Sequence, residues 1–463
     1  MKNSLRILFA IQLAVFSLRA QTFTSSNLPI IVINTNGQKI VDEPKINVDL
    51  KIIYNGEGKR NTLTDTVYNY NGKAGIEIRG SSSQMFPKKQ YGFETRDTAG
   101  EDLKVSLLGF PSESDWIFFA PYNDKSLLRD ALTYSLARSM GRYATRSRYC
   151  ELVLNKEYMG IYVLFEKIKR DKNRVNVSKL ESSDSTGDAL TGGYILKIDK
   201  LDGSGNDGFP SPHESFPGAK SQVMYQYHYP KPENITGAQK TYIKSWILTF
   251  EGAMQNSTYA DSLLGYRKYL DVPSLIDYCI INELTKNVDG YRLSTFMYKD
   301  KDTKNTKMFF GPVWDFNLGF GNCDYYSTSI TSGWQYAFKN WGENEVFLPP
   351  FWWEKIYQDP AFINELKTRW ITLRKNQFSL ATVNEWIDSM TVLLDESQKR
   401  NFIKWPVLNQ YVWPNAYVGG TYEKEISYLK SWIKNRFEWV DKELTGAIVE
   451  VERQSEVRPL KFS

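Results

Sequence analysis

The chain has 463 residues, of which 41% are hydrophobic and 24% charged, and its formal net charge is +5 at pH 7. This is ordinary globular composition, long enough for one large domain or two of usual size, and it argues against bulk disorder. The small net charge, with acidic and basic residues interspersed, gives no support for a nucleic-acid partner. Two histidines, and three cysteines without C-x-x-C spacing, make histidine triads, zinc sites and a disulfide framework poor hypotheses. A functional site is therefore expected to use carboxylate and lysine side chains.

The first twenty residues have the layout of a secretory signal. Lys2 and Arg6 precede the apolar run from Ile7 to Leu18, and Ala20 is a small residue at the expected cleavage position. The run is shorter than the ~20 residues that a membrane span needs. We therefore expect an exported protein, in the periplasm, on the cell surface or secreted, that keeps no transmembrane segment after signal removal.

The N-terminal part is expected to be rich in strands. Apolar residues alternate from Leu28 to Tyr54, with Asn-Gly turn signals, and a later short strand ends at Gly80. The serines after Gly80 can expose backbone N–H groups to an anion, and Arg79, Lys88 and Lys89 add positive charge. An anion site and a solvated basic loop are equally good interpretations of these residues.

Strands and helices then alternate. The sequence predicts a buried strand from Asp115 to Tyr122 and a helix, capped by Asn123 or Asp124, that ends at Gly141. A hairpin follows, in which Glu166 closes an apolar strand. An exposed strand end is the more common role for such a residue.

Further along, residues 201–234 are rich in Gly, Pro, Ser and His and predict a long irregular insertion. A helix is expected at 236–256. Asp271 is expected to cap the next helix, which is apolar and ends just before Asp289.

Two aspartates flank a predicted β-hairpin. Apolar runs at 293–298 and 308–313 surround a polar tip. With the turn centred on Asp302, the register places Asp289 opposite Asp315. Two close carboxylates repel each other unless a cation neutralises them, and a divalent metal ion is the usual answer.

The C-terminal part has a different character. Ten of the thirteen tryptophans lie beyond residue 330. This region also contains four predicted helices, at 349–358, 360–375, 380–402 and 421–445. We expect aromatic packing against the rest of the protein, and a substrate surface built from tryptophans is the second interpretation.

The glycine-serine loop, the lysines and the two aspartates suit phosphoryl transfer. Lysine and backbone N–H groups bind phosphate oxygens, paired aspartates suit magnesium, and a carboxylate can accept the proton of the attacking hydroxyl. The order along the chain is that of a protein kinase: nucleotide lysine, catalytic aspartate after a buried helix, metal aspartate after a hairpin.

Several motifs, spread over roughly residues 70–325, together resemble the spore coat protein H (CotH) kinase family; they are R-G-S-S-S-Q-M-F-P-K-K-Q-Y, Y-N-D-K-S-L-L-R-D-A-L-T-Y-S-L-A-R-S-M-G, Y-M-G-I-Y-V-L-F-E-K-I, N-V-D-G-Y-R-L-S-T-F-M-Y and G-P-V-W-D-F-N-L-G-F-G-N. The resemblance implies an α+β, atypical protein-kinase-like fold, and phosphorylation of Ser or Thr in a protein with ATP and Mg²⁺ or Mn²⁺. The resulting division of the chain is a signal peptide (1–20), a β-rich N-terminal region (21–115), a kinase-like core (116–330), a helical, Trp-rich region packed on the core (331–450) and a tail (451–463).

Carried over by position, Asp289 matches the family's catalytic aspartate and Asp315 its metal-binding aspartate. Lys88 or Lys89 matches the nucleotide lysine, and Glu166 falls where the nucleotide pocket would lie.

The chain departs from the family's pattern at two positions. Ser294 stands where the family often has Asn, a second metal ligand, and Asn317 replaces the last carboxylate of W-D-F-D. Both changes weaken metal binding, so a changed metal preference, reduced activity and a non-catalytic binding module that uses the same cleft stay open. A carbohydrate-active enzyme with two carboxylates is a further alternative, which the lysine-rich loop argues against.

Overall fold

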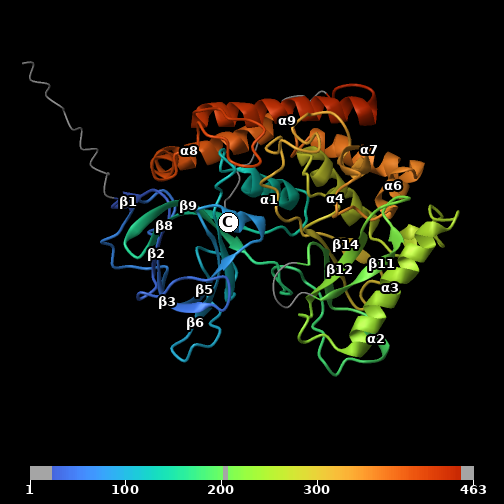
Figure 1. Ribbon diagram of the computed structural model, residues 1–463, viewed down its shortest axis with the longest axis horizontal. Helices are drawn as coiled ribbons and strands as arrows, with labels where there is room; N and C mark the ends of the chain where they lie inside the picture. Colours follow the sequence, from blue (N-terminus) through green and yellow to red (C-terminus); the bar gives the residue numbers. More distant parts are fainter. Residues whose placement is uncertain (1–22, 202–206, 450–463) are drawn as a thin grey trace, which may run out of the picture.

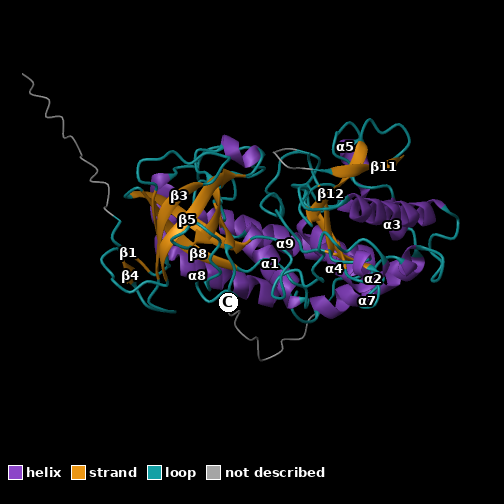
Figure 2. Ribbon diagram, turned by 90° about the horizontal axis from the view of Figure 1, so that it is seen from below, coloured by secondary structure: helices purple, strands orange, loops and turns teal. Residues whose placement is uncertain are grey.

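The computed structural model describes residues 23–201 and 207–449, and its strands gather in two groups with helices between and around them (Figures 1 and 2). The strands are β1 (Ser25–Ser26), β2 (Ile30–Asn34), β3 (Ile46–Ile53), β4 (Asn61–Thr62), β5 (Tyr70–Arg79), β6 (Gln90–Arg96), β7 (Asp115–Phe119), β8 (Ser147–Leu154), β9 (Glu157–Glu166), β10 (Tyr194–Ile198), β11 (Gly208–Glu214), β12 (Gln222–Tyr229), β13 (Thr295–Lys299) and β14 (Met308–Phe310). The helices are α1 (Arg129–Ser139), α2 (Gly187–Leu190), α3 (Gly237–Gln255), α4 (Val272–Thr285), α5 (Lys339–Gly342), α6 (Trp352–Tyr357), α7 (Pro360–Arg374), α8 (Leu380–Lys404) and α9 (Tyr422–Thr445). The predicted signal (1–20) and tail (451–463) lie outside the described residues.

The N-terminal strands close into a barrel in the order β2-β3-β5-β6-β7-β9-β8, and β2 closes it by pairing in parallel with β8. Alternation along the strands fills the interior: Ile31, Ile33 and Leu50 belong to the barrel core, while their neighbours Asn34 and Asp49 are more exposed. The prediction of a strand-rich N-terminal part is confirmed.

A second, antiparallel sheet has the order β11-β12-β10-β13-β14. Its strands β11 and β12 fall in the 201–234 stretch, so the prediction of an irregular insertion there was wrong for these residues. Phe209, Ser211 and Tyr225 are buried in the alternating pattern of strands, but prolines at 210 and 212 concealed that pattern. Proline is tolerated in β11 because the strand lies at the sheet edge.

The start of α1 also differs from the prediction. The helix begins at Arg129, because Asp124 organises the preceding turn instead of capping a helix. The Asp124 carboxylate accepts hydrogen bonds from the backbone N–H groups of Ser126 (3.1 Å) and Arg129 (2.8 Å). By contrast, α3 and α4 match their predictions, and the Asp271 carboxylate accepts from the Ser274 N–H at 2.8 Å as an N-cap.

The C-terminal helices α6 to α9 lie close to their predicted ranges and span both parts of the molecule (Figure 1). On α8, the Asn401 side chain accepts from the Ile161 N–H of β9 (3.1 Å). On α9, the Arg436 guanidinium donates to the Glu283 carbonyl of α4 (2.8 Å). Trp352, Trp353 and Trp370 are buried, which confirms the packing interpretation for these three.

The described residues contain no helix that is long and apolar enough to cross a membrane. Cys150, Cys279 and Cys323 are buried and form no disulfide among them.

Candidate functional site

A cleft of about 670 Å³ lies between the barrel and the second sheet. The barrel contributes the end of β5 with the loop after it, and the residues that follow β9. The second part contributes residues after β10, before β13 and after β14. Most of the sequence-predicted site residues meet here; they are Arg79, Asp289, Ser294, Asp315 and Asn317.

The hairpin that was expected to pair the aspartates has a different register. Met297 pairs with Phe310 and Tyr298 with Phe309, which moves the turn beyond Asp302. The predicted register, centred on Asp302, was therefore wrong, because residues 301–305 form an extra turn of backbone hydrogen bonds. Asp289 and Asp315 lie in irregular segments beyond the ladder.

Asp289 is held in place by Arg292. The Arg292 guanidinium donates to Asp289 Oδ1 at 2.8 Å and lies over the Phe338 ring. Burial raises the pKa of Asp289 above its ordinary value, and the charge of Arg292 opposes this effect. A carboxylate with a raised pKa is suited to accept a proton near neutral pH.

Asp315 faces the cleft and is accessible to solvent within it. Desolvation by the surrounding protein nevertheless raises the pKa of Asp315 to about 6. Repulsion from Asp289, and to a smaller extent from Asp199, raises it as well. The Asn287 side chain donates to the Asp315 carbonyl at 3.1 Å and so ties the two aspartate segments together.

Three non-glycine residues around the site have left-handed backbone: Tyr291 (φ 70°), Ser294 (φ 48°) and Asp315 (φ 66°). Each such residue costs on the order of 1–3 kcal/mol and persists where the surroundings enforce it, often at functional sites. A buried hydrogen bond holds Tyr291 in this conformation, because its hydroxyl donates to Glu283 at 3.0 Å.

Cationic side chains also line the cleft. The Arg79 guanidinium lies 5.7 Å from the centre of the Trp314 ring, and Lys167 and Lys200 lie in the same cleft. Burial lowers the pKa of Arg79, and the charge of Asp315 opposes this effect. The cleft therefore contains cationic side chains together with the two aspartates.

Lys88 does not line the cleft, contrary to its predicted role as nucleotide lysine. It is 1% exposed, and its Nζ donates to the Ile161 carbonyl (2.6 Å) and to Asn401 Oδ1 (2.9 Å), which joins the barrel to α8. Lys89 does not line the cleft either, since its Nζ donates to the Gln84 carbonyl (2.5 Å).

Replacement of Lys88 by Met is expected to lower the free energy of unfolding by about 1–3 kcal/mol, because buried acceptors lose their donor. Burial lowers the pKa of Lys88 from 10.5 to about 7. The folded protein thus binds fewer protons than the unfolded chain between these values, so Lys88 makes stability rise with pH from about 7 to 10.5.

Urea unfolding at pH 7, 8 and 9 measures both effects. In Lys88→Met the free energy of unfolding should rise less with pH than in wild type. Lys89→Met is the control and should follow the wild type. Equal pH slopes in wild type and Lys88→Met would contradict the structural role of this lysine.

Glu166 is likewise turned away from the cleft. It is fully buried, and its carboxylate accepts from the Arg146 guanidinium at 2.8 Å and lies 3.7 Å from Arg174. Because side chains alternate along a strand, the next residue, Lys167, faces the cleft instead. The period of two in F-E-K-I was the available signal.

Asp199, Lys200 and Asp130 also line the cleft and were not predicted as site residues. Asp199 and Lys200 follow a strand, β10, and such strand ends are a common place for functional residues. Asp130 lies in the first turns of the predicted helix and within one of the quoted family motifs, without a predicted role.

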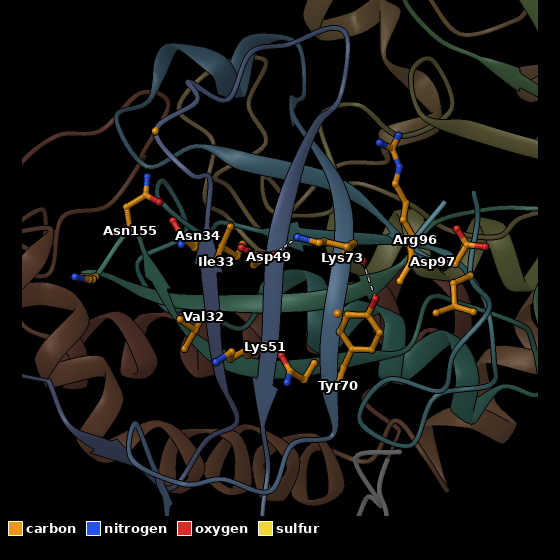
Figure 3. A pocket seen from close by; sticks show the side chains of 16 residues that line it. Val32, Ile33, Asn34, Asp49, Lys51, Tyr70, Lys73, Arg96, Asp97 and Asn155 are labelled. Atoms are coloured by element: carbon orange, nitrogen blue, oxygen red, sulfur yellow. Dashed lines mark hydrogen bonds and ion pairs between the residues drawn. The ribbon is translucent and has the colours of Figure 1, made fainter. Parts of the chain in front are cut away.

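A second hollow, of about 1080 Å³, lies on the outward face of β2, β3 and β5 (Figure 3). Two of its charged side chains pair with each other, Lys73 with Asp49 at 2.6 Å. None of the predicted site residues lines it. The cleft between the two sheets is therefore the candidate site.

The donor atoms of the cleft are of the kinds that bind a hard divalent cation, because the carboxylate of Asp315, the amide of Asn317 and the hydroxyl of Ser294 line the same cleft. Within residues 23–201 and 207–449, no group of three or more His, Cys, Asp or Glu is arranged to hold a metal ion. A cation at this site would thus need amide oxygen, water or ligand oxygen in addition to carboxylates.

Fold and cleft together define a mixed α/β protein whose β-barrel and second sheet share a charged cleft. A family model described as "CotH kinase protein" matches residues 76–440. The chain belongs to the CotH kinase family. No curated protein matches it.

Proposed function

We propose that the protein is a CotH-like atypical protein kinase that transfers phosphate from ATP to Ser or Thr of an exported or cell-surface protein, with Mg²⁺ or Mn²⁺. The observation that carries the proposal is the single cleft in which Asp289 and Asp315 face Arg79 and Lys167. Family membership supports kinase-like chemistry and, in general, the use of a nucleotide and a metal ion.

Each residue has a role that follows from its chemistry. Asp289, held by Arg292, accepts the proton of the acceptor hydroxyl. Asp315, with Asn317 and Ser294 beside it, supplies oxygen ligands for the cation, which when bound neutralises phosphate charge. Arg79, Lys167 and Lys200 are placed to bind phosphate oxygens.

The non-catalytic binding module remains the second candidate, because Ser294 and Asn317 are weaker ligands than the family pattern provides. Incubation with radiolabelled ATP and a Ser-rich acceptor protein, with Mg²⁺ or Mn²⁺, separates the two. Label in the acceptor supports the kinase. Nucleotide binding without any transfer, under both metal ions, supports the binding module.

Lys167→Met is expected to weaken ATP binding roughly tenfold to a hundredfold, since a hydrogen bond to a charged group contributes ~1.5–3 kcal/mol. Lys167 is exposed at the end of β9, so its loss should leave the melting temperature nearly unchanged.

The measurement is calorimetric titration with ATP and Mg²⁺. Lys89→Met is the matched control, since Lys89 lies outside the cleft lining and should keep wild-type affinity. An unchanged affinity in Lys167→Met, or a large loss in Lys89→Met, would reject the assignment of Lys167.

A further inference from the structure

Asp130, in the first turn of α1, has one carboxylate oxygen without a partner. The residue is 3% exposed and lines the cleft. Its Oδ1 accepts the Phe316 N–H at 2.7 Å, whereas Oδ2 meets no hydrogen-bond partner among the described residues. The Tyr134 hydroxyl lies near this carboxylate but does not reach Oδ2 in hydrogen-bond geometry. An unpaired buried carboxylate oxygen is costly.

Four other buried carboxylates of the described chain are paired with arginine. Asp124 pairs with Arg129, Glu166 with Arg146, Glu283 with Arg436 and Asp441 with Arg374. For Asp130, no ion pair with a described residue is found within 4 Å, and Asp315 and Asp124 repel it. Within the described chain, buried Glu251 and Glu425 also lack an ion pair, but they accept hydrogen bonds instead. Asp130 lacks an ion pair there and also has a buried oxygen without a hydrogen-bond partner, which points to a partner from outside the chain.

The surroundings of Asp130 supply further oxygen donors. Asp315 is its strongest charged neighbour, and the Phe316 N–H bond fixes α1 against the Asp315 segment. Asn317 Nδ2 donates to Asn123 Oδ1 at 3.0 Å, which leaves the Asn317 amide oxygen for another contact. Two carboxylates and an amide oxygen form the donor set of a hard divalent cation.

A proton is the other way to neutralise Asp130. Burial, followed by repulsion from Asp315, raises the pKa of Asp130 well above its ordinary value. A protonated carboxyl would donate a hydrogen bond, however, and Oδ2 makes no hydrogen bond with a described residue. A cation satisfies both carboxylates at once.

We propose that Asp130 and Asp315 together hold a divalent cation, with Asn317 as a third oxygen ligand. Helix α1 thereby supplies a carboxylate ligand in a chain whose Ser294 and Asn317 are weak ligands. The inference deepens the proposed kinase function, and the role of the cation in phosphate transfer rests on that function. The binding of the cation does not.

The test is calorimetric titration of the full chain with Mn²⁺ in the absence of nucleotide. Wild type should bind Mn²⁺, and Asp130→Asn should bind it at least tenfold more weakly. Asp42→Asn, which removes an exposed carboxylate at the rim of the same cleft, is the matched control and should bind like wild type. No binding to wild type, or equal binding to wild type and Asp130→Asn, overturns the proposal.

Melting temperatures distinguish a ligand from a structural residue. In EDTA, Asp130→Asn should melt higher than wild type, because the substitution removes repulsion with Asp315 while keeping an acceptor for the Phe316 N–H. Added Mn²⁺ should raise the melting temperature of wild type more than that of the variant. A lower melting temperature in EDTA combined with a wild-type gain in Mn²⁺ would make Asp130 structural and overturn the proposal.

The two proposals can fail separately. Mn²⁺ binding that depends on Asp130, without phosphate transfer, retains the cation site and removes the kinase. Phosphate transfer combined with equal Mn²⁺ binding in wild type and Asp130→Asn retains the kinase and removes this site.

Discussion

Replacement of Asp289 by Asn should reduce phosphate transfer by about 10²–10⁴-fold, the contribution typical of a general base, and leave the protein folded. The amide keeps the shape of the side chain and still accepts the Arg292 hydrogen bond of 2.8 Å, but it cannot take a proton. Since burial raises the pKa of Asp289, the ionised form is disfavoured in the folded state, and the melting temperature should not fall.

The measurement is the initial rate of label transfer from ATP, with nucleotide affinity measured in parallel. Affinity should change little, because the proposed role of Asp289 is toward the acceptor hydroxyl and not toward the phosphates. Glu345→Gln is the matched control, because Glu345 is also next to Arg292, at 3.8 Å, yet does not line the cleft. A transfer rate in Asp289→Asn within threefold of wild type would exclude Asp289 as the base.

Asp315→Asn should abolish the stabilisation that Mg²⁺ and ATP give together, and transfer should fall to background. Asp315 contributes a carboxylate to the proposed cation site, and a neutral amide oxygen is a weaker ligand. A thermal shift with nucleotide, with and without Mg²⁺, measures the loss. A wild-type shift in the variant would remove Asp315 from the metal site.

The metal-free protein offers a second measurement on Asp315. Its pKa is raised from 3.8 to about 6 in the folded state, so the folded protein binds more protons than the unfolded chain between these values. The contribution to stability is therefore fully present below about pH 3.8 and is lost as pH rises through about 6.

In EDTA, wild type should thus lose stability relative to Asp315→Asn between pH 4 and pH 7, as measured by urea unfolding. Added Mn²⁺ should reverse the difference at pH 7, because the cation stabilises the ionised pair. Parallel pH profiles for the two proteins in EDTA would contradict the raised pKa of Asp315.

Much of the fold follows from local sequence. The capped and amphipathic patterns located α3, α4 and the C-terminal helices, and the Asp271 cap was found at its predicted place. Helix caps and helical periodicity can be predicted locally, because the residues that make the capping hydrogen bonds and the apolar face are close together in the sequence. The prolines of β11 hid a strand because sheet edges tolerate them, which no local rule reveals.

The motifs alone predicted that Asp289 and Asp315 belong to one site, and both residues line the same cleft. Which lysine side chain shares the cleft with them depends on tertiary contacts. Lys88 donates a hydrogen bond to Asn401 of α8, 313 residues away, whereas Lys167 lines the cleft. The tertiary structure also left Asp130 Oδ2 unpaired among the described residues. A local pattern states which residue types are available, but the contacts that engage or spare a charge come from distant segments, because burial sets the free energy of a charge.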